Sequence, residues 1–326
     1  MKTRSEPIQS GTLSMDRFAF VLRRPPQLVP VLLGISIITF ILVQMMPGDP
    51  ARIMLGPRAS EDAIAAVRAR YGLDQPLLVQ YGFYLMNVLR ADFGQSLAYR
   101  APVLDVILTR LVPTICLLVY GLVMSVTFTI ALAVAAARRP GGWVDQLARL
   151  FCVIGLGLPS FWLGLMLIML FSLRLKLFPV SGFGGSLIDV LWHLFLPALT
   201  IAIAVTPILT RNLRATLISQ SAADYAVAGR SKGLSENDLF FRHIFPNSLL
   251  PTISLLGIVV SFLIGGTVVI ETVFNVPGMG QLLVRAVLLR DYFIVQGITL
   301  FFAFGVVLTS FIVDIITVAL DPRVKL

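Results

Sequence analysis

The sequence predicts an all-α protein that crosses a membrane several times. Its 326 residues are 57% hydrophobic and only 13% charged, and the mean hydropathy is +0.89, values that exclude a soluble domain. Six runs of 21 to 27 residues contain no Asp, Glu, Lys or Arg. A helix of about 20 residues crosses the roughly 30 Å of hydrocarbon in a bilayer. The sequence therefore predicts six transmembrane helices, within residues 25–48, 111–137, 150–173, 190–210, 244–270 and 292–313.

The basic residues assign a side to each connection between these spans. With six spans both termini lie on one side, and the segments on that side carry 15 Lys and Arg, whereas the two short connections on the other side carry four. Basic residues in short connections favour the cytoplasm. We therefore expect both termini in the cytoplasm. The parts are a cytoplasmic tail (1–27), a first span (28–46), an extracytoplasmic cap (47–108), a core with five further spans (109–320) and a cytoplasmic tail (321–326).

The extracytoplasmic segment contains two predicted helices. Ser60, followed by two acidic residues, is typical of a helix start, and Gly72 of a helix end. A second apolar pattern at helical spacing starts at Pro76 and closes at residues 92–94. We expect a small helical cap packed against the mouth of the bundle, with a solvated linker as the alternative.

The longest cytoplasmic connection, residues 211–247, predicts a short helix, a glycine and a second short helix. Residues 221–231 are rich in alanine and other small side chains, and Gly233 suits a left-handed stop. Ser235 with Asp238 three residues later resembles a capping box. Such a segment presents a flat surface to the groove of a partner protein.

Several motifs in this chain resemble the membrane permease subunits of type I ABC importers, and most closely the branch that serves dipeptides, oligopeptides and nickel. The outer segments carry MPGDPA (46–51), YGLDQPLLVQY (71–81), FGQSL (93–97) and ETVFNVPGMGQLL (271–283), and the chain ends with LDPR (320–323) before its last residues. The connection 211–247 resembles the cytoplasmic signature of that branch. We assign ATPase coupling to eight of its positions, all of which match the signature except Gly229: Asp224, Tyr225, Ala228, Gly229, Lys232, Gly233, Leu234 and Ser235.

Three residues depart from the usual pattern of this branch. Gly229 and Ser231 stand where alanine or larger side chains are usual, and Pro246 follows the Arg-His pair at 242–243. Because glycine has a low helix propensity, we expect Gly229 to loosen the first short helix.

The chain lacks the residues that an independent energy source requires. It contains no Gly-x-x-x-x-Gly-Lys-Ser/Thr loop for nucleotide phosphates. The acids nearest the predicted spans, Glu271 and Asp314, lie at span ends, where snorkelling or a local pair is the ordinary explanation. A secondary carrier or channel acting alone is thus disfavoured. A membrane-embedded enzyme is also disfavoured, because the spans contain no paired acid, nucleophile and base, or metal-ligand constellation.

We expect no cofactor and no metal ion on this subunit. Cys116 and Cys152 lie in spans without further ligands nearby, and His193 and His243 have no Cys, Asp or second His at ligand spacing. ATP and Mg²⁺ would then be bound by partner subunits, as the family resemblance implies. The positive net charge has a topological explanation, so no nucleic acid is expected.

Glycine and proline in two spans mark a candidate translocation path. Residues 155–164 (GLGLPSFWLG) and 257–266 (GIVVSFLIGG) allow bending and close helix approach. The positions assigned to the path are Pro159, Ser160, Gly265, Gly266 and Glu271. Plain helix packing is the alternative interpretation.

The resemblance implies a non-catalytic permease subunit in the bacterial inner membrane. Its expected partners are a homologous permease rather than a second copy of this chain, two ABC ATPase subunits, an extracytoplasmic substrate-binding protein and membrane lipid. The expected substrates are di- or oligopeptides, moved inward by alternating access. Nickel chelates, glutathione or another small solute are alternatives within the same architecture.

Overall fold

The computed structural model describes residues 29–42, 44–45, 50–55, 59–96 and 98–320, and these residues form helices and connections without a β-strand. Both predicted tails, parts of the first span, and parts of the motifs at 46–51 and 320–323 lie outside the described residues. The described part of the first predicted span is an apolar helix, Val29–Leu42.

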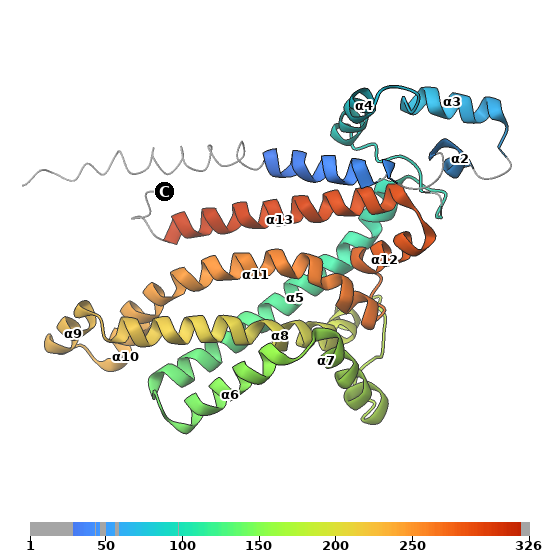
Figure 1. Cartoon of the computed structure of the whole chain (residues 1–326). Coiled ribbons are helices and arrows are strands. Elements are labelled where there is room, and N and C mark those ends of the chain that lie inside the picture. Colours follow the sequence, from blue (N-terminus) through green and yellow to red (C-terminus); the bar gives the residue numbers. More distant parts are fainter. Residues whose placement is uncertain (1–28, 43, 46–49, 56–58, 97, 321–326) are drawn as a thin grey trace, which may run out of the picture.

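Four long helices form the body of the molecule (Figure 1): α5 (Val103–Arg138), α8 (Leu187–Ser221), α11 (Phe245–Val273) and α13 (Tyr292–Leu320). Each is long and apolar enough to cross a membrane. Helix α8 packs on α5 and on α11, and α11 packs in turn on α13. These four helices coincide with four of the six predicted spans.

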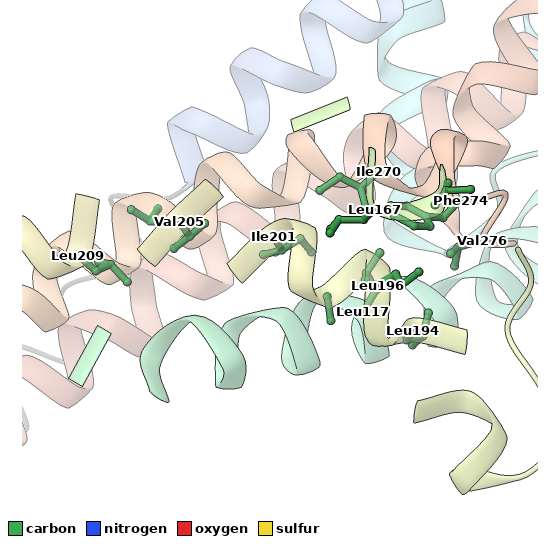
Figure 2. Packing of buried hydrophobic residues seen from close by; sticks show 13 residues of the cluster. Leu117, Leu167, Leu194, Leu196, Ile201, Val205, Leu209, Ile270, Phe274 and Val276 are labelled. Carbon is green, nitrogen blue, oxygen red and sulfur yellow. The ribbon is translucent and has the colours of Figure 1, made fainter. Parts of the chain in front are cut away.

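Close side-chain packing joins α5, α8 and α11 (Figure 2). The main cluster combines Leu117 of α5 with Leu194, Ile201 and Leu209 of α8 and Phe274 beyond α11. Lipid tails are as apolar as leucine, so van der Waals contact rather than transfer from water stabilises such a bundle. The contact is tight at Gly121, where an added Cβ would lie 2.9 Å from the Ile201 side chain.

The third predicted span is broken rather than continuous. Residues 150–173 divide between α6 (Trp143–Gly157) and α7 (Ser160–Leu167), and a π-helical segment (Ile168–Arg174) continues α7. The two parts are bent by 106°. The cause is Pro159, which has no N–H to donate and holds Leu158 in extended backbone (φ −90°, ψ 125°).

In the described part of the chain, four helices are therefore long and apolar enough to cross a membrane, or up to five if the bent pair α6 and α7 is one span. The helix Val29–Leu42 is shorter than a full span within the described residues. The exact count of six stays a prediction.

Both helices predicted in the cap segment are present, with a short helix α2 (Pro50–Leu55) before them. Helix α3 (Glu61–Tyr71) begins after Ser60, whose side chain accepts the N–H of Ala63, and ends at Gly72 with φ +62°. Helix α4 (Leu77–Leu89) follows Pro76. The hydroxyl groups of Ser36 and Tyr81 lie 2.8 Å apart, so α4 is fastened to the helix Val29–Leu42.

The remaining short helices lie at opposite ends of the long ones (Figure 1). Helix α12 (Met279–Leu289), which the sequence did not predict, lies at the same end as α3 and α4. Helices α9 (Asp224–Ser231) and α10 (Glu236–Leu239), with a π-helical segment (Phe240–Ile244) after them, lie at the other end. The two ends therefore carry separate candidate functional surfaces.

Candidate functional site

The connection between α8 and α11 is anchored to the long helices by its apolar side chains. Ala226 of α9 is fully buried, and so is Leu239 of α10, at 1% exposure. They pack in one cluster with Ala133 of α5 and with Leu213 and Leu217 of α8. A load applied to this connection is therefore transmitted to α5 and α8 directly.

The glycine that departs from the family pattern has a packing role. Helix α9 continues through Gly229 to Ser231, so the expected loosening is not observed. Gly229 is buried, and a Cβ on it would lie 2.9 Å from Cδ1 of Leu239 and 3.4 Å from Cδ1 of Leu234. The absence of a side chain lets α9 and α10 approach closely.

Two arginines brace the connection. Arg230 donates from Nε to Glu236 (2.8 Å) and from Nη1 to the carbonyl of Ser221 (3.0 Å). The hydrogen bond with Glu236 raises the pKa of the Arg230 guanidinium. Arg138 at the end of α5 donates to Asn237 (3.0 Å), and its guanidinium lies 5.2 Å from the centre of the Phe240 ring. Both ends of the connection are thus tied to the body of the protein.

The predicted turn between the two short helices is confirmed. Gly233 has φ +85°, a conformation that favours glycine, and no atom lies within 4 Å of the position of an added Cβ. Ser235 accepts the N–H of Asp238 (3.1 Å) and donates to its carboxylate (2.7 Å), which caps α10. The requirement for glycine here is conformational and not steric.

The structure brings seven of the eight predicted coupling residues to the surface and buries the other, Gly229. Several exposed side chains there are apolar: Tyr225 is 39% exposed, Val227 52% and Leu234 43%. Tyr225 and Val227 lie within three residues of Ala228 on α9, and the small side chain of Ala228 is also exposed. An exposed apolar patch around a small residue is typical of a protein-binding surface.

The residues assigned to the translocation path fall into three separate environments. Pro159 and Ser160 form the break between α6 and α7. Gly265 and Gly266 are exposed on α11, and no atom lies within 4 Å of a Cβ added at either position. Other glycines of the same two motifs instead serve packing: a Cβ at Gly155 would lie 2.6 Å from Pro207.

The exposed face of α11 continues into a groove of about 540 Å³ between α11 and α13. Its polar lining residues recur at one or two helical turns within each helix, which was a usable signal, but Asp314 alone was singled out in the sequence. They are Ser254 and Ser261 of α11 and Ser310, Asp314 and Thr317 of α13. The four hydroxyl groups each donate to a carbonyl one turn earlier in their own helix. Asp314 is the ionisable side chain of this lining, and ionisable side chains of membrane helices mostly face protein or water.

Glu271 lies in a closed site and does not share that exposed face. Its side chain is fully buried, and its two oxygens accept from the hydroxyl of Thr114 (2.6 Å) and the N–H of Gln281 (3.0 Å). Thr114 also accepts the N–H of Met279 (2.8 Å). The carboxylate therefore caps the amino-terminal end of α12 and joins it to α5 and α11. Neither snorkelling nor a pair with a basic side chain describes this arrangement.

The described part of the chain contains no group of three or more His, Cys, Asp or Glu side chains placed to hold a metal ion. His193 contacts Asp189 one turn earlier, at 2.9 Å from its carbonyl. Cys116 is half-buried and Cys152 buried, both as free thiols.

Comparisons with known proteins agree over nearly the whole length. Residues 129–326 match the family described as "Binding-protein-dependent transport system inner membrane component". Residues 17–119 match the family that describes the N-terminal part of such membrane components. The chain is 37% identical over 306 residues to the glutathione transport system permease protein GsiC of Salmonella typhimurium, which covers 94% of this chain and 98% of the relative. The same values hold for GsiC of Escherichia coli strain K12.

A solved structure confirms the fold. A chain in the crystal structure of an amino acid ABC transporter with histidines superposes with a TM-score of 0.52 at 13% identity, covering 65% of this chain and 93% of the other. This likeness concerns the arrangement of helices alone. Together with the family match over more than half of the chain, it shows that this protein belongs to the binding-protein-dependent transport system inner membrane components and is a permease subunit of an ABC importer.

Proposed function

We propose that this permease subunit imports small peptides, and that glutathione, itself a tripeptide, is the first substrate to test. The observation that carries the proposal is the 37% identity to a glutathione permease over 94% of this chain. The motifs of the peptide branch support the same substrate class. Nickel chelates remain within the same architecture, but no residue described above favours them.

We propose that two ABC ATPase subunits supply the energy and bind ATP and Mg²⁺, one of them seated on the surface around Ala228. The exposed apolar residues Tyr225, Val227 and Leu234 support this assignment. This subunit then contributes no catalytic group. A substrate-binding protein docks at the opposite end, near α3, α4 and α12.

We propose a homologous permease as the neighbour within the membrane. The groove between α11 and α13 supports a protein or a water-filled path on this side, because its lining includes Asp314, and ionisable side chains of membrane helices mostly face protein or water. A homologous rather than identical partner follows the resemblance to the peptide branch. Substrate would pass between the two permeases by alternating access, along the exposed glycines of α11.

Uptake of labelled substrate tests the proposed function. Deletion of this chain in its host should abolish ATP-dependent uptake of radiolabelled glutathione or of a dipeptide, and expression of the chain in trans should restore it. Competition between the two substrates identifies the preferred one. If the deletion left the uptake of both glutathione and the dipeptide unchanged, this result would contradict the assignment.

We also propose that both termini lie in the cytoplasm, and single cysteines test this topology. Ser96 is a poor position for a label because it is 3% exposed and donates to Asp291. Ser181 and Ser231 are exposed at opposite ends. With Cys116 and Cys152 replaced by alanine, a membrane-impermeant maleimide should label Ser181→Cys in intact spheroplasts and Ser231→Cys only after permeabilisation. The reverse pattern would invert the topology.

The isolated chain is expected to bind no nucleotide, because it has no phosphate-binding loop. Equilibrium dialysis of the purified chain against labelled ATP with Mg²⁺ should give no saturable binding. ATP hydrolysis should require added ATPase subunits. Binding of one ATP per chain in their absence would contradict the proposed division of labour.

A further inference from the structure

A basic pocket lies between α6 and α8, and neither the short helices α9 and α10 nor the candidate path lines it. It has a volume of about 230 Å³, and Arg149, Arg211 and Arg214 line it together with apolar side chains. These arginines lie where the charged residues meet the uncharged runs that begin at residue 150 and end at residue 210. The pocket is therefore at the level where a bilayer changes from hydrocarbon to headgroups.

The charge around the pocket is unbalanced. Asp145, which is fully buried, accepts two hydrogen bonds from Arg214, and Nη2 of Arg149 lies 3.8 Å from its carboxylate. Arg211 is exposed beside them. One carboxylate thus faces three guanidinium groups, and the excess positive charge favours an anion.

A buried hydroxyl on the pocket wall lacks a protein partner. Thr210 is fully buried and lines the pocket, and its Oγ1 makes no hydrogen bond within the described part of the chain. Thr200 of the same helix, in contrast, donates to the carbonyl of Leu196 (2.9 Å). Burial of an unsatisfied hydroxyl is costly, and a ligand oxygen in the pocket would satisfy it.

The other walls fit a lipid rather than a soluble anion. Val153 and Leu156 line the pocket and are 71% and 50% exposed, so an apolar surface leads away from the arginines along α6. Trp143 at the start of α6 is 73% exposed, as is typical of aromatic residues at a membrane interface.

We propose that this pocket binds the headgroup phosphate of an anionic phospholipid, with an acyl chain lying over Val153 and Leu156. The lipid belongs to the cytoplasmic leaflet, which rests on the proposed function and its topology with both termini in the cytoplasm. Arg149 and Arg211 contact the phosphate, and Thr210 donates to one of its oxygens. Arg214 is held by Asp145 and positions the wall of the pocket between the two helices.

Thermal unfolding of the full-length chain, purified from membranes in mild detergent, measures the binding. Titration with dioleoylphosphatidylglycerol should raise the melting temperature with a saturable dependence, whereas dioleoylphosphatidylcholine should not. Each basic residue contributes about 1 kcal/mol near an anionic lipid, so Arg149→Gln with Arg211→Gln should raise the half-saturating lipid concentration at least about tenfold. The matched control, Arg139→Gln with Arg174→Gln, removes the same charge outside the pocket and should titrate as the wild type does.

Thr210→Val separates ligand binding from folding. Because the hydroxyl has no protein partner, this variant should melt at or above the wild-type temperature without lipid and should need several-fold more phosphatidylglycerol. Wild-type titration curves for both the arginine and the threonine variants would overturn the proposal. Equal stabilisation by phosphatidylcholine, or by glycerol 1-phosphate alone, would also overturn it by indicating a nonspecific lipid effect or a soluble anion. The readout requires no transport, so its failure is distinguishable from failure of the proposed function.

Discussion

Replacement of Ala228 by tryptophan is expected to reduce substrate uptake at least about tenfold while the chain remains at wild-type abundance in the membrane. Ala228 is exposed in the middle of α9, and Tyr225 and Val227 of the same helix are exposed as well. A bulky ring there would hold a seated ATPase away from the surface by steric overlap. The anchoring residues Ala226 and Leu239 are untouched, so the fold should not change.

Gly233→Val should uncouple the importer for a different reason. A side chain at φ +85° costs about 1 kcal/mol or more, although the surrounding space is open. The strain should alter the angle between α9 and α10 rather than block contact. We therefore expect a smaller loss of uptake than for Ala228→Trp, and Gly233→Ala should lose less than Gly233→Val.

Both losses should appear together in uptake and in substrate-stimulated ATP hydrolysis, measured in proteoliposomes with equal amounts of protein. Ser181→Trp, exposed at the opposite end, is the matched control and should leave hydrolysis unchanged. Ser186 is less suitable because its side chain caps α8 by accepting the N–H of Asp189. Normal uptake by Ala228→Trp and Gly233→Val would remove the coupling role from this connection.

Local features of the fold were predictable where one residue decides the backbone. Ser60 and Gly72 bound α3, and Gly233 and Ser235 separate α9 from α10, because capping and left-handed backbone depend on a few adjacent residues. The long helices α5, α8, α11 and α13 were predictable because an uncharged run of more than 20 residues has few alternatives.

Features that depend on distant residues were not predictable in the same way. Pro159 marked a place where the helix bends, but the 106° angle depends on how α7 packs against α8 and α11. Gly229 by itself predicts a weaker α9, because the sequence does not show that Leu239 packs against it. The polar groove requires α11 and α13 to be neighbours, so Ser261 and Ser310 had no evident relation in the sequence.

Glu271 was the acid whose environment differed most from expectation, and its removal should destabilise the protein strongly. Glu271→Ala removes the acceptor of the Gln281 N–H, leaves the hydroxyl of Thr114 with only the 3.4 Å hydrogen bond to the carbonyl of Arg110, and opens a cavity beneath Gly278 and Gly280. Loss of hydrogen bonds to a buried carboxyl group and of packing should cost about 3 kcal/mol or more. Glu271→Gln keeps the volume and one carbonyl oxygen, so its loss of stability should lie between those of the wild type and Glu271→Ala.

Because Cys116 is half-buried and Cys152 is buried, a thiol-reactive fluorophore can follow unfolding without any added label. We expect Glu271→Ala to lower the melting temperature of the purified chain by about 5 °C or more, and Glu271→Gln by less. Thr272→Ala is the matched control, since Thr272 is exposed and its hydroxyl donates only to Val268 of its own helix. If Glu271→Ala melted at the same temperature as the Thr272→Ala control, the carboxylate would not be what holds α12 to α5 and α11. This end of the bundle would then depend on apolar packing around Met279 and Leu282.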